Sequence, residues 1–205
     1  SAPMRRAADG KAKAVAISFD ERSTPAWYHT SSSLPANQIQ YLFGRRFGEY
    51  APDALGKFRV ITDLLGGFSY TDGLSEFLQK ALGLLEVEGS FFTLLQDVHS
   101  ESGGNQPFYA DSRYLTELEN TDGSELKVCA WLKRIGWVEV TCQYRQDWRP
   151  RVEGYQIKKV CENVAVPALD RTHFAAGTPP ERRFKLRNPP SAPSAATPSQ
   201  TDKLR

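Results

Sequence analysis

The chain has 205 residues, of which 40% are apolar and 24% charged, values that fit one globular domain and exclude a largely disordered chain. Its 26 Lys and Arg residues against 24 Asp and Glu leave a net charge of +2. This balance argues against general nucleic-acid binding, which needs a clear cationic surplus, and the short apolar runs exclude a membrane-spanning helix.

The first half of the chain predicts three strands. Apolar runs over 14–20 and 58–63 each end in an aspartate, and a third run over 38–43 ends before Gly44. Short apolar runs bounded by turn residues are typical of buried strands.

A helix and a fourth strand follow. Apolar residues between Leu74 and Leu85 recur at three- and four-residue intervals, which predicts a helix over 73–86. The apolar run over 90–95 predicts a buried strand. The polar segment 96–122 is long for a connection within a compact domain, so we expect an insertion with a function of its own.

The last elements of the predicted domain are a helix over 124–136 and strands over 137–143 and 154–160. The two strands are joined without a helix, so we expect them to pair antiparallel. The alternation of strands and helices before them is typical of an α/β domain with a mostly parallel sheet.

The composition changes after this domain. We expect a C-terminal extension over 166–187, which contains the basic segment ERRFKLR at 181–187. Either a solvated surface strand or a patch for an anionic partner fits that segment. From residue 188 to 205 the chain is rich in Pro and Ser without apolar periodicity, which predicts a disordered tail.

The three cysteines of the chain are Cys129, Cys142 and Cys161, and no two form a C-x-x-C pair. The spacing therefore suggests neither a disulfide framework nor a structural zinc site. No apolar segment of signal-peptide length follows the basic residues near the N-terminus, so we expect a reduced, cytoplasmic protein.

Three segments resemble the class I (Rossmann-like) S-adenosylmethionine-dependent methyltransferases. VITDLLGGFSYTD resembles the family's fourth-strand motif, LQKALGLLEVEGSFFTLL its helix, turn and fifth strand, and ELKVCAWLKRIGWVEVTCQ its late helix and sixth strand. The resemblance covers 14–160. It implies that 14–165 is a Rossmann-like α/β domain with a mostly parallel sheet and an antiparallel last strand.

One part of the family pattern has no counterpart here. The family's first strand and glycine-rich loop are missing, and residues 1–13 resemble a remnant of its first helix. The resemblance therefore implies a fold that is incomplete at the N-terminus. We expect the codons upstream of Ser1 to encode an apolar strand that ends in spaced glycines.

The resemblance implies S-adenosylmethionine as the cofactor and places its contacts at strand ends. These are Asp20 after the second strand of the family, Gly44 and Arg45 after the third, and Asp63 and Leu64 at the end of the fourth. Since ligands sit beyond the carboxyl ends of parallel strands, we expect the two aspartates to converge on one crevice. A solvated turn for Asp20 and a cap of the following loop for Asp63 are the alternatives.

The methyl acceptor should lie nearby. Phe68, Tyr70 and Tyr109 follow the family's fourth and fifth strands, so we expect them to line the acceptor pocket. His99 is the candidate for proton transfer, because histidine titrates near neutral pH, with a plain surface position as the alternative. We expect no metal.

These observations together predict S-adenosylmethionine-dependent methyl transfer to a small-molecule or protein acceptor, in a truncated form without activity of its own. Asp63-Leu64-Leu65-Gly66 lacks the Asn/Asp-Pro-Pro-aromatic signature of the enzymes that methylate amino groups of nucleic-acid bases or of protein glutamine. The alternative function is a non-catalytic Rossmann-like interaction module, whose insertion 96–122 and basic segment would bind a partner.

Overall fold

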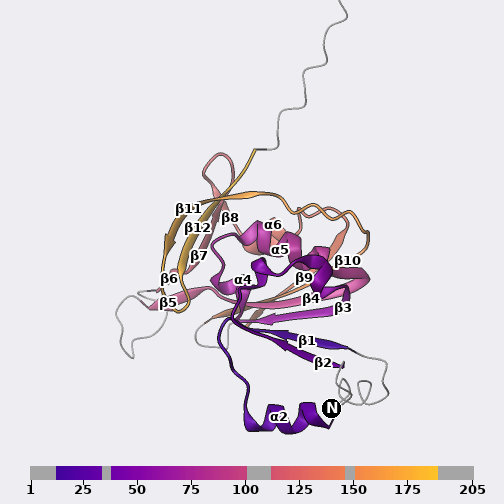
Figure 1. Cartoon of the computed structure of the whole chain (residues 1–205). Helices are drawn as coiled ribbons and strands as arrows, with labels where there is room; N and C mark the ends of the chain where they lie inside the picture. The colour runs from indigo at the N-terminus through magenta and orange to yellow at the C-terminus, as the bar shows by residue number, and fades with distance from the viewer. Residues whose placement is uncertain (1–12, 34–37, 101–111, 146–150, 189–205) are drawn as a thin grey trace, which may run out of the picture.

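A computed structural model describes residues 13–33, 38–100, 112–145 and 151–188 (Figure 1). Two four-stranded sheets carry the core of the molecule. The first has the order β3 (Phe58–Leu64), β4 (Leu85–Gln96), β10 (Val152–Lys159) and β9 (Val138–Arg145). The second has the order β11 (Leu169–Ala175), β12 (Glu181–Leu186), β7 (Thr116–Glu119) and β8 (Glu125–Leu126).

Two smaller sheets and several short helices complete the described chain. One sheet pairs β1 (Ala14–Ile17) with β2 (Ile39–Leu42), and the other pairs β5 (Val98–Ser100) with β6 (Ser112–Tyr114). The helical segments are α2 (Pro25–Ser32), η1 (Phe47–Glu49), α3 (Pro52–Leu55), α4 (Gly67–Tyr70), α5 (Leu74–Gly83) and α6 (Val128–Leu132). Each described helix is too short or too polar to cross a bilayer.

Helix α5 packs on the first sheet through the apolar stripe that its sequence predicts. Leu74, Leu78 and Leu82 are at most 1% exposed and belong to one core cluster with Phe91 of β4 and Ile157 of β10. Each such side chain contributes about 1.5–3 kcal/mol when removed from water. The helix therefore forms close to the predicted range 73–86, over Leu74–Gly83.

The hairpin of β9 and β10 confirms the antiparallel pairing that its connection predicts. Val138 lies opposite Lys159 at one end of the pair, and Arg145 lies opposite Val152 at the other. Strand β10 also pairs antiparallel with β4, whereas β3 and β4 run parallel. The predicted strand over 90–95 is part of the longer β4.

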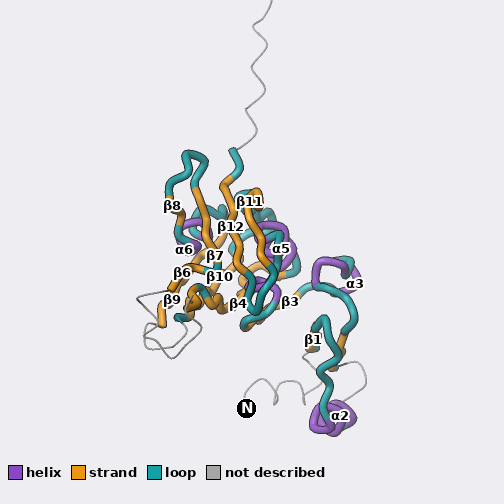
Figure 2. Tube along the Cα trace, turned by 90° about the vertical axis from the view of Figure 1, so that its left-hand side faces the viewer, coloured by secondary structure: helices purple, strands orange, loops and turns teal. Residues whose placement is uncertain are grey.

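The predicted Rossmann-like α/β fold with one mostly parallel sheet is wrong. The described strands divide among separate sheets, parallel pairing is confined there to β1/β2, β3/β4 and β12/β7, and the described α-helices have only four to ten residues. The predicted helix over 124–136 shrinks to α6 because β8 takes up its start. The small β1–β2 sheet stands apart from the two larger sheets (Figure 2).

Part of the second sheet comes from the predicted C-terminal extension and from the predicted insertion within the domain. The predicted extension 166–187 forms β11 and β12, and β12 pairs in parallel with β7 from the predicted insertion 96–122. The predicted tail from 188 onward lies outside the described residues, apart from its first residue. The predicted remnant helix over 1–13 is likewise almost wholly outside them.

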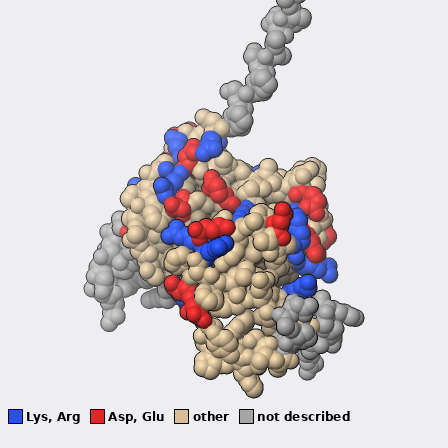
Figure 3. All heavy atoms as spheres, viewed as in Figure 1, with Lys and Arg blue, Asp and Glu red and all other residues tan. Residues whose placement is uncertain are grey.

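The basic segment 181–187 is neither a fully solvated strand nor an open cationic patch. Arg183 pairs with Glu117 at 2.6 Å and Arg187 pairs with Asp170. On the face shown in Figure 3, basic and acidic side chains are interspersed. The segment therefore offers an anionic partner little uncompensated charge.

Arg182, the second residue of that segment, is buried and connects three elements, β12, α4 and β7. It is 1% exposed. Its Nη1 donates to the carbonyl oxygens of Phe68 at 2.9 Å and Thr71 at 2.8 Å, and its Nη2 donates to Oγ1 of Thr116 at 2.9 Å. Burial lowers the pKa of Arg182 to about 10, with the charge of Asp97 opposing the shift, so the side chain remains a cation at neutral pH.

Replacement of this buried cation should destabilise the protein strongly. Arg182→Met removes the donors of three acceptors in or next to the core, so we expect the free energy of unfolding to fall by about 3 kcal/mol or more in urea denaturation. The exposed Arg183→Met is the matched control and should cost less than about 1 kcal/mol. Equal losses in the two variants would contradict the structural role of Arg182.

A disulfide joins Cys129 of α6 to Cys142 of β9, which are 13 residues apart in sequence, and Cys161 is a free thiol. The expectation of three reduced cysteines is therefore wrong. The spacing did not indicate the bond because the two cysteines meet only through the turn after α6. In that turn Trp137 has a φ of 64°, and the chain reverses direction so that β9 packs against α6.

Reduction of the disulfide should measurably weaken the fold. A bond that closes a loop of this length restricts the unfolded chain by about 3 kcal/mol, so reductant should lower the urea midpoint of the oxidised protein. The double variant Cys129→Ser/Cys142→Ser should show the lower midpoint without reductant and no further response to it. If reductant still lowered the urea midpoint of this variant, the loss of stability would not come from the Cys129–Cys142 bond.

Candidate functional site

The five residues expected to contact the cofactor belong to two different sheets. Asp20 follows β1, Gly44 and Arg45 follow β2, and Asp63 and Leu64 end β3. No described strand joins β1 to β3. The expected convergence of Asp20 and Asp63 on one crevice is therefore wrong, while a contact of each residue with the cofactor stays a prediction.

Four of these residues lie at the surface or in open turns. The side chain of Asp20 is 70% exposed, with a guanidinium nitrogen of Arg22 3.8 Å away. Gly44 has a φ of 83°, a left-handed turn conformation that favours glycine. Arg45 is exposed, and Leu64 is 64% exposed at the end of β3.

Asp63 caps the turn that follows its strand. Its Oδ2 accepts a hydrogen bond from the backbone N–H of Phe68 at 2.9 Å and another from the hydroxyl of Thr93 at 3.3 Å. Burial raises the pKa of Asp63, and hydrogen bonds from Phe68, Gly67 and Thr93 oppose that shift. A Cβ at Gly66 would lie 2.4 Å from Asp63 Oδ1, so the close approach depends on glycine. Asp63 therefore caps the loop that follows its strand, which is the alternative role that the sequence left open for it.

Two of the residues expected to line the acceptor pocket, Phe68 and Tyr70, lie in the same short helix α4. Phe68 is fully buried beside the rings of Phe91 and Tyr155, so it is a core residue and does not line a pocket mouth. Tyr70 is 41% exposed. Tyr109 and the side chain of His99 lie outside the described residues, although the His99 backbone belongs to β5.

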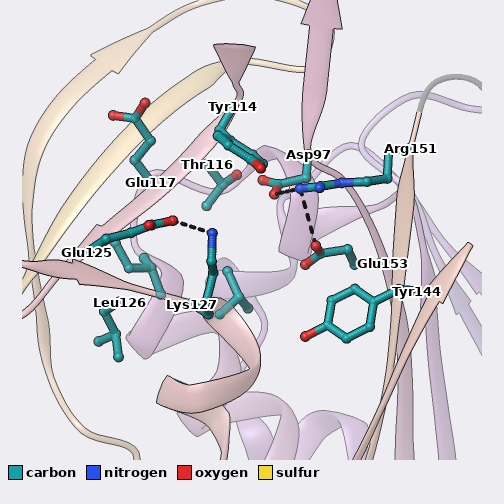
Figure 4. Close-up of a pocket in the computed structure, with 12 residues that line it drawn as sticks. Asp97, Tyr114, Thr116, Glu117, Glu125, Leu126, Lys127, Tyr144, Arg151 and Glu153 are labelled. Atoms are coloured by element: carbon teal, nitrogen blue, oxygen red, sulfur yellow. Dashed lines mark hydrogen bonds and ion pairs between the residues drawn. The ribbon is translucent and has the colours of Figure 1, made fainter. Parts of the chain in front are cut away.

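A polar cavity of about 210 Å³ lies instead beyond the carboxyl end of β4 (Figure 4). Strands β6 to β10 and the start of α6 also contribute to its wall. We call it the Asp97 pocket and define it by the lining side chains of Asp97, Tyr114, Lys127, Tyr144, Arg151 and Glu153.

One arginine bridges two buried carboxylates in this pocket. The Nη2 of Arg151 lies 3.2 Å from Asp97 Oδ2 and 3.4 Å from Glu153 Oε1. The carboxyl of Glu153 also accepts a hydrogen bond from the hydroxyl of Tyr155. Asp97 is 5% exposed and Glu153 is 7% exposed. Two carboxylates thus share one guanidinium away from water.

Of the two carboxyl groups that share Arg151, Asp97 has a strongly raised pKa. Burial raises its pKa to about 7, the neighbouring charge of Glu153 adds to the rise, and the charge and hydrogen bond of Arg151 oppose it. A hydrogen bond from the backbone N–H of Thr116 also lowers the pKa of Asp97, with the smallest effect. Asp97 Oδ1 accepts no hydrogen bond from the described residues. Asp97 is therefore a buried proton acceptor near neutral pH with one oxygen left for a ligand.

The opposite side of the pocket carries a second ion pair. Lys127 pairs with Glu125, and its ammonium lies 5.2 Å from the ring centroid of Tyr114. The guanidinium carbon of Arg151 lies 4.8 Å from the same centroid. Figure 4 shows the Asp97, Arg151 and Glu153 group facing Lys127 and Glu125 across the pocket.

Sequence reasoning missed this site, although part of its signal was available. Asp97 follows the predicted strand 90–95, so the rule that selected Asp63 at the end of its strand applies equally to Asp97. Arg151 and Glu153 gave no such signal, because their place depends on the register of β10, where Glu153 lies opposite Leu95.

Comparison with known proteins found no family model and no curated protein that matches this chain.

The elevated pKa of Asp97 makes stability depend on pH. Below about pH 4 the carboxyl is protonated in both the folded and the unfolded protein. Between about pH 4 and pH 7 the unfolded protein releases this proton while the folded protein keeps it, so the free energy of unfolding falls as the pH rises. This loss is complete above about pH 7. The full effect is about 2–4 kcal/mol.

Asp97→Asn should remove this dependence. Urea denaturation at pH 4.5 and pH 8 should show the variant gaining about 2–4 kcal/mol relative to wild type at the higher pH. The exposed Asp53→Asn serves as the control and should follow the wild-type profile. Parallel profiles for wild type and Asp97→Asn would contradict the assignment.

Proposed function

We propose that this protein takes part in S-adenosylmethionine-dependent methyl transfer and that the Asp97 pocket holds the methyl acceptor, a small molecule or a protein side chain. The observation that carries the proposal is Asp97 itself: a buried carboxyl with a pKa of about 7 and an oxygen without a described partner, beyond the carboxyl end of β4. Ligands of parallel strand pairs bind at this end.

The strand pairing of the segments that resemble methyltransferases supports this proposal. They form β3 with α4, α5 with β4, and α6 with β9. The parallel pairing of β3 with β4 and the antiparallel pairing of β9 with β10 agree with what the resemblance implies for these segments. The Asp97 pocket borders β4, β9, β10 and α6, so the acceptor would lie next to the resembling segments.

The pocket also contains a group that can take up the proton that a nitrogen or oxygen acceptor loses on methylation. A group whose pKa lies near the working pH takes up such a proton most effectively. Asp97 meets this condition, and Arg151 fixes the position of its carboxyl through Oδ2. The other carboxyl, Glu153, is held by Tyr155. In this proposal Asp97 is the proton acceptor and Arg151 and Glu153 are positioning residues.

The described residues do not fit the methyl donor. Asp20 and Asp63 lie in separate sheets, and the carboxyl of Asp63 is engaged by Phe68 and Thr93. We therefore assign no described residue to the binding of the methyl donor.

The proposal is tested by calorimetry and a methyl-transfer assay. A version of the chain extended by the upstream coding sequence should bind S-adenosylhomocysteine with a micromolar Kd, about −8 kcal/mol, and the present chain should bind at least tenfold more weakly. Asp20→Asn and Asp53→Asn in the extended version should both leave this binding unchanged, because neither carboxyl is assigned to the donor. A folded extended version that binds neither S-adenosylhomocysteine nor labelled methyl donor would overturn the proposal.

A second candidate function is non-catalytic partner binding. Exposed apolar side chains favour it: Val60 is 58% exposed and Leu64 64% exposed on β3, and Phe19 is 60% exposed beyond β1. Parallel strands are normally covered on both faces. The absence of any methyl transfer by the extended version, together with burial of these side chains by a partner in hydrogen exchange, would favour this second function.

A further inference from the structure

We propose that the Asp97 pocket selects a small organic cation that carries N–H donors, such as a primary or secondary ammonium group. The inference rests on the proposed function only in taking as the methyl acceptor the neutral amine that forms when this cation gives a proton to Asp97. Binding of the cation to the pocket does not require a methyl donor.

The charges around the pocket favour a cation. Four carboxyl side chains line it and two cationic side chains accompany them: Asp97, Glu117, Glu125 and Glu153 against Lys127 and Arg151. Lys127 is paired with Glu125, and Glu117 is paired with Arg183 outside the pocket. The negative charge that remains comes from Asp97 and Glu153, which share the single guanidinium of Arg151. A bound ammonium group would offset the remaining negative charge, whereas an anion would add to it.

The position of Asp97 calls for a ligand with hydrogen-bond donors. Its Oδ2 receives the guanidinium of Arg151, whereas Oδ1 is buried without a donor from the described residues. Buried carboxylate oxygens rarely lack a donor, because the loss costs free energy. The side chain is 5% exposed and points into the pocket beside Tyr114 (Figure 4). An N–H group of a ligand would supply the missing bond.

One tyrosine ring at the rim contributes to the recognition of a cation. Tyr114 already lies beside the cationic groups of Arg151 and Lys127, at 4.8 Å and 5.2 Å from its centroid, so its ring is engaged by the protein itself. Tyr144 also lines the pocket and is 50% exposed. Aromatic faces attract ammonium groups through their quadrupole. The Tyr144 ring therefore gives a cation a surface that a neutral ligand of the same shape would use less well.

The size of the pocket limits the ligand to a small molecule. A cavity of about 210 Å³ equals about seven water molecules at about 30 Å³ each. This volume admits a compact amine with a short apolar body, for which Leu126 and Val128 provide contacts.

The test compares an amine with its neutral isostere on the full chain without a methyl donor. Calorimetric titration with benzylamine should give a Kd at least tenfold lower than titration with benzyl alcohol. Asp97→Asn should weaken benzylamine binding at least tenfold and leave benzyl alcohol unchanged, and Asp53→Asn should change neither. If Asp97→Asn fails to fold by circular dichroism, Tyr144→Leu replaces it and should weaken benzylamine binding selectively.

Equal affinities for the two probes, or benzylamine binding that survives both pocket substitutions, would overturn the cation site. Its failure and that of the proposed function are distinguishable. Benzylamine binding to a protein whose extended version ignores S-adenosylhomocysteine would overturn methyl transfer and leave the cation site standing. The reverse result would retain methyl transfer and remove the preference for an amine.

Discussion

The buried guanidinium of Arg182 connects the parts of this structure that the site needs. Asp63 caps the turn that begins α4, and the carbonyl oxygens at the end of α4 accept hydrogen bonds from Arg182 of β12. The same side chain reaches Thr116 on β7. One cation therefore links the first sheet, through α4, with two strands of the second sheet. The charge of Asp97 raises the pKa of this arginine and so favours its cationic form.

This arrangement explains why the Asp97 pocket forms where it does. Asp97 continues β4 of the first sheet, and Thr116 to Leu126 belong to strands of the second. The pocket thus lies between the two sheets, and Arg151, which directly precedes β10, reaches into it. The protonation of Asp97 depends on its burial there and on the neighbouring charges of Glu153 and Arg151.

The sequence predicted those elements that depend on local periodicity. Helix α5 and strands β4, β9 and β10 follow from the spacing of their apolar residues, and the short connection of β9 and β10 sets their antiparallel pairing. The second sheet could not be predicted in this way. Its strands β7 (TELE) and β12 (ERRFKL) are short and highly charged, and they pair across a long stretch of chain. Arg182 is buried within the most basic segment of the sequence, which is the opposite of what composition indicates.

The disulfide has a consequence for how the Asp97 pocket holds its shape. Val128, one residue before Cys129, and Tyr144, two residues after Cys142, both line the Asp97 pocket. A covalent cross-link therefore braces two walls of the cavity. Without this bond, the separation of the two walls would depend on packing alone, so the cross-link helps to set the width that the cavity offers to a ligand.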